Sequence, residues 1–230
     1  MPPGSDRDAR GGGRGVRLLV FDLDGTLVDS KTDLANAVNR TLREFGIDPL
    51  PHPTIFRYVG NGATLLIRRS LGPEREGVLP DALRFFLDHY GRHLLDTTVP
   101  YPGVAESLAA HAGLYEMALL TNKPLGMTET ILSGLSLSRY FSEVHGGDSF
   151  DSKKPDPEGL RAILAARAVR PGEAIMVGDS VNDVLAGRGA GTGTCGVTYG
   201  LGADGFAEHP PDFTIDRFPD LFRRIRPLRG

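Results

Sequence analysis

Short apolar runs alternate along the chain with longer segments in which apolar residues recur at helical spacing. Unbroken apolar runs are typical of strands buried on both faces of a parallel sheet. Helical patterns lie between these runs, near residues 103–112, 124–135, 157–168 and 181–190. The alternation predicts an α/β fold with a Rossmann-like, mainly parallel sheet. The predicted strands are Leu18–Phe21, Met117–Thr121, Glu143–His145, Ala174–Gly178, Cys195–Tyr199 and Asp212–Ile215.

Residues 31–98 interrupt the alternation. Apolar residues recur at helical spacing from Leu34 to Phe45 and from Leu83 to Leu94, with glycines and prolines between them. The pattern predicts roughly four helices and no strand. We therefore expect a small all-α-helical cap at 31–98, inserted after the first strand, and an α/β core at 16–30 and 99–230.

The first residues differ in composition from the rest of the chain. Residues 1–15 are rich in glycine, proline and charge, which predicts a disordered tail. Because arginines are few there and aromatics absent, an RNA-binding tail is the weaker interpretation.

Composition narrows the classes of function. The formal net charge of -3 gives no reason to expect nucleic acid or a membrane surface as a partner. The single cysteine, Cys195, cannot form an internal disulfide and favours a cytoplasmic protein. The sequence has neither an apolar run near the roughly 18 residues of a membrane helix nor a secretory signal.

Carboxylates follow two of the predicted strands. Asp22 and Asp24 come directly after the first, and alternate residues of a strand point the same way. Gly25 then permits a sharp turn. The strand Ala174–Gly178 runs into Asp179, with Asp183 four residues further on. Ligands of parallel α/β sheets bind beyond these strand ends.

Neighbouring strands would bring three or four of these carboxylates together. Such charges repel unless a proton or cation intervenes, and an oxygen-only cluster suits Mg²⁺. For Asp183, a role in capping a helix is an open alternative. An EF-hand is excluded, because Leu27 and Asp33 stand where its loop needs Gly and Glu.

Two further segments are polar at strand ends. Thr121 and Asn122 could hold a phosphoryl oxygen through a hydroxyl and backbone N–H groups. Lys154 is held extended by Pro155. Its ammonium, facing the carboxylates, would neutralise a phosphate and orient a nucleophile. Taken alone, Lys154 also fits a solvated surface lysine.

Together these segments resemble the haloacid dehalogenase superfamily of phosphatases. Order and spacing match across residues 17–190, and the helical insert resembles the superfamily's small cap. Several segments look most like the bacterial phosphoglycolate phosphatase family: FDLDGTLVDS, VGNGATLLIRRSLG, TNKP and the run from KKPDP to VGDSVND. The superfamily motifs correspond to Asp22-Leu23-Asp24-Gly25-Thr26, Thr121, Lys154, and Gly178-Asp179 with Asp183.

The resemblance implies a Mg²⁺-dependent phosphomonoester hydrolase that acts through an aspartyl-phosphate, with 2-phosphoglycolate as the expected substrate. Asp22 would be the nucleophile and Asp24 the general acid and base. Mg²⁺ would be held by Asp22, Asp179 and the backbone carbonyl of Asp24, with Asp183 in support. Thr121 and Lys154 would complete the catalytic set.

The cap offers a candidate for substrate recognition. Val59-Gly60-Asn61-Gly62 precedes a helix-like run, and a helix N-terminus attracts anions. A closing cap would bring Asn61 and Gly62 to the substrate carboxylate, near Asn122. A tight turn between two cap helices is the alternative.

Rival functions share many of these features. A dehalogenase would not need Asp24. A phosphomutase, or a phosphatase for pyrophosphate, nucleotides or sugar phosphates, fits the same motifs. Intact motif residues argue against an inactive binding module. We expect a small-molecule phosphate ester as the partner, neither nucleic acid nor membrane, and a monomer or weak dimer.

Two other motifs carry no function. A GxGxxG match begins at Gly191, but it follows a helix and precedes a strand, the reverse of a dinucleotide site. Cys195 begins an apolar run and is predicted to be buried and inert.

Overall fold

The central feature of the protein is a six-stranded sheet in the order β6-β5-β2-β7-β8-β9. The computed structural model describes residues 15–228, so the predicted tail lies outside the described residues except for Gly15. All neighbouring strands of this sheet are parallel, which confirms the predicted fold class. The strands are β2 (Leu18–Phe21), β5 (Glu116–Leu120), β6 (Glu143–His145), β7 (Ala174–Gly178), β8 (Gly193–Val197) and β9 (Phe213–Ile215).

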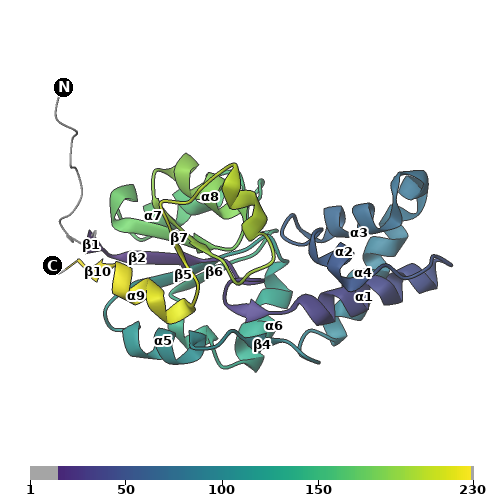
Figure 1. Cartoon of the computed structure of the whole chain (residues 1–230), viewed down its shortest axis with the longest axis horizontal. Helices are drawn as coiled ribbons and strands as arrows, with labels where there is room; N and C mark the ends of the chain where they lie inside the picture. The colour runs from purple at the N-terminus through teal and green to yellow at the C-terminus, as the bar shows by residue number, and fades with distance from the viewer. Residues whose placement is uncertain (1–14, 229–230) are drawn as a thin grey trace, which may run out of the picture.

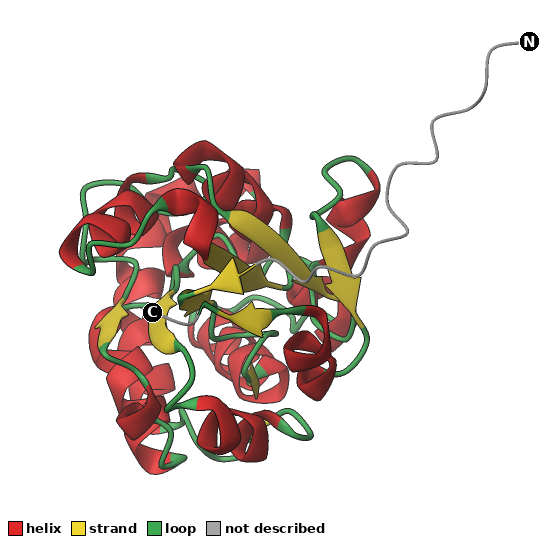
Figure 2. Cartoon of the chain, turned by 90° about the vertical axis from the view of Figure 1, so that its left-hand side faces the viewer, coloured by secondary structure: helices red, strands yellow, loops and turns green. Residues whose placement is uncertain are grey.

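Helices cover both faces of the sheet, above and below it in Figure 1 and around the strands in Figure 2. Alternate residues of β2 supply the two faces. Leu18 and Val20 belong to the apolar cluster that contains α7, whereas Leu19 and Phe21 belong to the other. The core helices are α5 (Val104–His111), α6 (Leu125–Gly134), α7 (Glu158–Ala166), α8 (Val181–Ala190) and the short α9 (Leu221–Arg224). No helix in residues 15–228 is long and apolar enough to cross a membrane.

Strand β8 begins before the predicted start at Cys195 and ends before Tyr199. Its first residue, Gly193, adds no apolar side chain to the pattern from which the strand was predicted. The strand is also rich in glycine because its neighbours pack closely. A Cβ on Gly196 would lie 2.6 Å from the ring of Phe206. Cys195 is buried as predicted, and burial raises the pKa of its thiol.

A block of helices lies to one side of the sheet (Figure 1). We call residues 31–98 the cap. The chain enters it through β3 (Val28–Asp29) and leaves it through β4 (Val99–Pro100), which pair antiparallel. A second two-residue pair joins β1 (Gly15–Val16) to β10 (Arg226–Pro227). The cap helices are α1 (Lys31–Glu44), α2 (His52–Phe56), α3 (Ala63–Leu71) and α4 (Leu79–Arg92), with a 3₁₀ turn at Pro73–Val78.

Candidate active site

The site forms where the three central strands end. Phe21 of β2 is in register with Leu119 of β5 and Val177 of β7, so the residues that follow each strand emerge side by side. Asp22 follows β2, and its N–H donates to the carbonyl of Val177 at 2.9 Å. Asp179 follows β7. The neighbouring strand ends therefore bring the two predicted carboxylates together.

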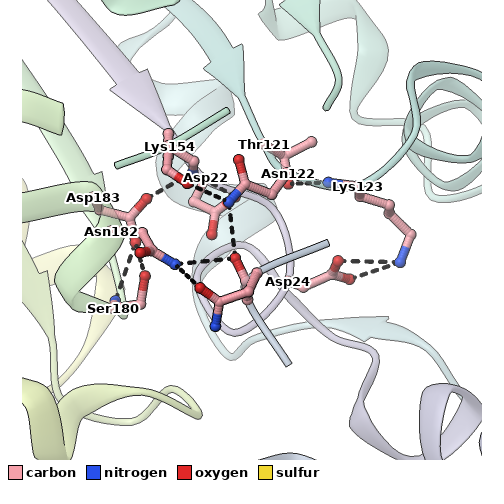
Figure 3. Close-up of polar contacts among 11 residues, drawn as sticks. Asp22, Asp24, Thr121, Asn122, Lys123, Lys154, Ser180, Asn182 and Asp183 are labelled. Atoms are coloured by element: carbon pink, nitrogen blue, oxygen red, sulfur yellow. Dashed lines mark hydrogen bonds and ion pairs between the residues drawn. The ribbon is translucent and has the colours of Figure 1, made fainter. Parts of the chain in front are cut away.

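Three carboxylates meet at this edge. Oxygens of Asp22, Asp179 and Asp183 lie within 4.8 Å of one another, and all three residues are buried. The Lys154 ammonium lies 2.9 Å from Asp22 Oδ1 and 2.6 Å from Asp183 Oδ1 (Figure 3). Lys154 is only 5 % exposed, which excludes the solvated-lysine interpretation. We call these four residues the acidic cluster.

Asp183 caps a helix, as the sequence allowed, and its support of a metal stays a prediction. Its Oδ2 accepts hydrogen bonds from the backbone N–H and the hydroxyl of Ser180, which forms a capping box at the start of α8. Its Oδ1 accepts from Lys154. The helix cap therefore fixes the carboxylate that holds the lysine.

The acidic cluster carries more negative than positive charge. Burial raises the pKa of Asp22 to about 6; Lys154 opposes the rise, and Asp183 adds to it. Burial and the charges of Asp22 and Asp183 raise the pKa of Asp179 to about 8, against the N–H donors of Leu201 and Gly202. For Lys154, the two carboxylates outweigh burial and raise the pKa. A cation would relieve this repulsion.

The surroundings of Asp179 fit Mg²⁺. All donors in the acidic cluster are carboxylate oxygens, the ligand type that Mg²⁺ prefers. Gly25 has φ +79°, and a Cβ there would lie 2.2 Å from Asp179 Oδ2. A Cβ on Gly200 would lie equally close to Asp179 Cβ, at 2.2 Å. Because neither glycine has a Cβ, the chain can pass close to Asp179 at the end of β2. Gly25 thus has this role as well as making the turn.

Asp24 lies apart from the acidic cluster. Its carboxylate accepts from the Lys123 ammonium at 3.0 and 3.1 Å (Figure 3). It also accepts from the hydroxyl of Ser30. Of the three or four carboxylates that the sequence allowed to meet, three therefore do so, and the Asp24 side chain pairs with Lys123 instead. The proposed metal contact of Asp24 through its backbone carbonyl stays a prediction.

The remaining predicted residues also lie near this edge. Thr121 is buried, and its hydroxyl accepts from the N–H of Lys123 at 3.3 Å. The Asn122 amide donates to the carbonyls of Gly60 and Lys154, at 2.9 and 2.8 Å. Its side-chain amide therefore joins cap to core, and the predicted contact of a backbone N–H with a phosphoryl oxygen stays a prediction.

The glycine-rich segment of the cap reaches the core. Gly62, with φ +83°, is the N-cap of α3 as the sequence suggested, and it lines a pocket above Asp22. The Asn61 side chain accepts from Asn182 at 3.2 Å, and Asn61 does not line that pocket. Gly62 is thus placed to face a substrate, whereas Asn61 contacts the core.

The pocket between cap and core encloses about 40 Å³. Asp22 and Asp24 lie on its core side beside Thr121, Asn122 and Lys123. Its other walls are mainly apolar and include Leu34, Leu66, Phe86 and Met127. A small polar centre inside apolar walls is the usual form of a small-molecule site.

Residues 19–197 match a protein family described as "Haloacid dehalogenase-like hydrolase". The chain belongs to the haloacid dehalogenase-like hydrolase family. It is 41 % identical over 193 residues to a phosphoglycolate phosphatase of Psychrobacter arcticus, covering 80 % of this chain and 84 % of the relative. It is 40 % identical over 214 residues to phosphoglycolate phosphatase 1 of Pseudomonas aeruginosa, covering 89 % and 78 %.

A solved structure agrees with the family membership. The crystal structure of a predicted phosphoglycolate phosphatase from Haemophilus somnus matches with a TM-score of 0.86 and 32 % identity. The match covers 90 % of this chain and 97 % of that one. The fold is thus that of a haloacid dehalogenase-like hydrolase.

Sequence reasoning missed several polar residues of this hydrolase site. Lys123 pairs with Asp24 and also donates to the Tyr90 hydroxyl of α4 at 2.7 Å. Asn182 donates to Gly60 and Asn61. For Lys123 a signal existed, because it directly follows Thr121-Asn122 at a strand end. Tyr90 gave none, since it falls on the apolar stripe of its helix.

Proposed function

We propose that the protein is a Mg²⁺-dependent phosphomonoester hydrolase that converts 2-phosphoglycolate to glycolate and phosphate. The observation that carries the proposal is the division of charge around Asp22. Lys154 and Asp183 lie on one side of Asp22, and the Asp24–Lys123 pair lies on the other (Figure 3). The names of the relatives support the choice of substrate.

Asp22 is the proposed nucleophile. Its carboxylate oxygen attacks phosphorus and forms an aspartyl-phosphate as the bond to the ester oxygen breaks. Lys154, 2.9 Å away, orients the carboxylate and offsets phosphate charge, while Thr121 offers its hydroxyl to a phosphoryl oxygen. Asp22 and Asp179, with the Asp24 carbonyl and Asp183 in support, would hold Mg²⁺. When bound, Mg²⁺ supplies positive charge against the repulsion between phosphate and carboxylate.

Asp24 is the proposed general acid and base. It gives a proton to the ester oxygen, which leaves with the glycolate. It then takes a proton from the water that attacks the aspartyl-phosphate, and this step releases phosphate and restores Asp22. Ser30 and Lys123 fix the Asp24 carboxyl for both transfers.

The pocket favours a small leaving group. About 40 Å³ between apolar walls suits a two-carbon acid better than a nucleoside. Contacts from Asn122 and Asn182 to Gly60 seat the cap over the pocket. We propose that the cap moves as a unit and excludes water when it closes.

The test is a hydrolysis screen with Mg²⁺ over phosphoglycolate, pyrophosphate, nucleotides and sugar phosphates. We expect the highest kcat/KM for phosphoglycolate. The nearly isosteric Asp22→Asn should keep the fold and lower kcat more than about 100-fold, a loss of roughly 3 kcal/mol. Asp88→Asn, on the surface of α4, is the control and should match the wild type. A preference for another substrate would overturn the assignment of phosphoglycolate as substrate. An active Asp22→Asn variant would overturn the assignment of Asp22 as nucleophile.

A further inference from the structure

Lys123 is a buried cation without a role in the proposed chemistry beyond fixing Asp24. It is 6 % exposed and directly follows Asn122 at the end of β5. Its ammonium contacts both Asp24 oxygens and the Tyr90 hydroxyl, and it lies 4.6 Å from the centre of the Tyr90 ring. Burying a charge is costly, so its place in the pocket calls for a reason.

The position of Lys123 relates it to the leaving group. In the proposed reaction Asp22 attacks the phosphorus atom, and Asp24 gives a proton to the ester oxygen. The ammonium lies 3.0 Å from that carboxyl, on the side of Asp22 away from Lys154 and Asp183 (Figure 3). In phosphoglycolate a single methylene separates the ester oxygen from the carboxylate. The substrate carboxylate therefore falls next to the group that contacts Asp24.

A second ammonium comes near the cap: Lys153 Nζ lies 3.5 Å from the position that a Cβ on Gly62 would take, but Lys153 does not line the pocket. Among the described residues that line the pocket, Lys123 bears the only positive charge. The apolar walls, including Leu34, Leu66 and Phe86, offer an anion no hydrogen bond, whereas the N-terminus of α3 at Gly62 is a second part of the lining that attracts anions. A substrate oxygen can replace one Asp24 oxygen on the ammonium, because Asp24 keeps its other oxygen there and the hydroxyl of Ser30.

We propose that Lys123, positioned by Tyr90 of the cap, is the residue that selects phosphate esters whose leaving group carries a carboxylate. The inference rests on the proposed function and deepens it, since it assigns recognition of the second anionic group. Because Tyr90 lies on α4 and Lys123 in the core, the carboxylate site is complete only when cap and core meet. Recognition of the leaving group is thereby tied to closure.

The test compares two substrates of equal size, phosphoglycolate and isobutyl phosphate, whose leaving group carries no charge. Lys123→Met keeps the length of the side chain and removes its charge. Hydrogen bonds to charged groups contribute about 1.5–3 kcal/mol, so the ratio of the two kcat/KM values should fall about 10- to 100-fold. Tyr90→Phe should lower the ratio about 2- to 10-fold. Lys31→Met, at a half-exposed lysine, is the control and should leave it unchanged.

Equal losses on both substrates in Lys123→Met would overturn the inference, since they would mean that Lys123 only holds Asp24. A wild type that prefers isobutyl phosphate would also overturn it. If Lys123→Met does not fold, Tyr90→Phe decides, and an unchanged ratio there overturns it. A wild type that prefers another carboxylated ester, with the expected fall in ratio, would refute the proposed substrate and support the role of Lys123.

Discussion

Asp179 is held in place by backbone donors yet surrounded by other carboxylates. The N–H groups of Leu201 and Gly202 bond its Oδ2, at 2.7 and 3.2 Å, while Asp22 and Asp183 repel its charge. Glycines at 25 and 200 let the chain pass close to it. At the scale of the residue, the position of the Asp179 carboxylate is thus fixed by the backbone. The negative charge of the surrounding carboxylates is left for a cation to balance.

This imbalance predicts how pH and Mg²⁺ act together. The pKa values of Asp22 and Asp179, about 6 and about 8, lie above the ordinary 3.8. Between pH 4 and 8 the folded protein binds more protons than the unfolded chain, so the unfolding free energy without metal falls as pH rises. Mg²⁺ must displace these protons. Its stabilising effect should therefore be larger at pH 8 than at pH 6.

Thermal unfolding at both pH values, with Mg²⁺ or with chelator, measures this difference. Calorimetry in two buffers should also detect protons released on Mg²⁺ binding. Asp179→Asn should remove most of the pH dependence. A shift in Tm that is the same at pH 6 and pH 8 would refute the assignment of the acidic cluster as the metal site.

At the scale of elements, Asp33 joins the two ends of the cap. It lies in the first turn of α1, and its carboxylate accepts from the backbone N–H and the hydroxyl of both Thr97 and Thr98, just before β4. Burial would raise its pKa, but these hydrogen bonds outweigh burial and hold it below the ordinary value. One side chain thus fastens the start of the cap to its end.

Asp33→Asn should lower the unfolding free energy by about 1.5–3 kcal/mol, since it removes the charge from these bonds. Because the folded pKa is depressed, the contribution is complete above the ordinary pKa of 3.8 and is lost as pH falls through the folded value. Urea unfolding at pH 7 and at pH 3 checks both. Asp81→Asn, on the exposed side of α4, should change stability by less than about 0.5 kcal/mol. Equal stability of the two variants at pH 7 would contradict the fastening role.

The parts of the structure that the sequence could predict are those that depend on local patterns. Asp22 and Asp179 follow unbroken apolar runs, and the rule for parallel strand ends brings them together. The start of β8 was not predicted, because Gly193 has no side chain that would indicate burial. Lys123 and Tyr90 meet only after cap and core are both folded. Their contact depends on how two elements dock, which no periodicity encodes.

At the scale of the whole molecule, the segment before α3 is where cap and core meet. The Gly60 carbonyl accepts from Asn122 and from Asn182, which come from different strand ends of the core. Both donors stand next to residues of the proposed chemistry, Thr121 and Asp183. The cap is therefore seated by the segments after β5 and β7 that also build the site, so loss of a seating contact should affect substrate binding more than folding.

Asn182→Ala tests this. It removes the donor to Gly60 and Asn61, both at 3.2 Å, and leaves the acidic cluster intact. Two neutral hydrogen bonds of about 0.5–1.5 kcal/mol predict a KM for phosphoglycolate raised at least several-fold, with faster hydrogen exchange at residues 59–62. Asn39→Ala is the matched control, because Asn39 bonds Leu50 within the cap. It should lower stability yet leave KM unchanged. If both variants shift KM alike, the contact at Gly60 does not seat the cap.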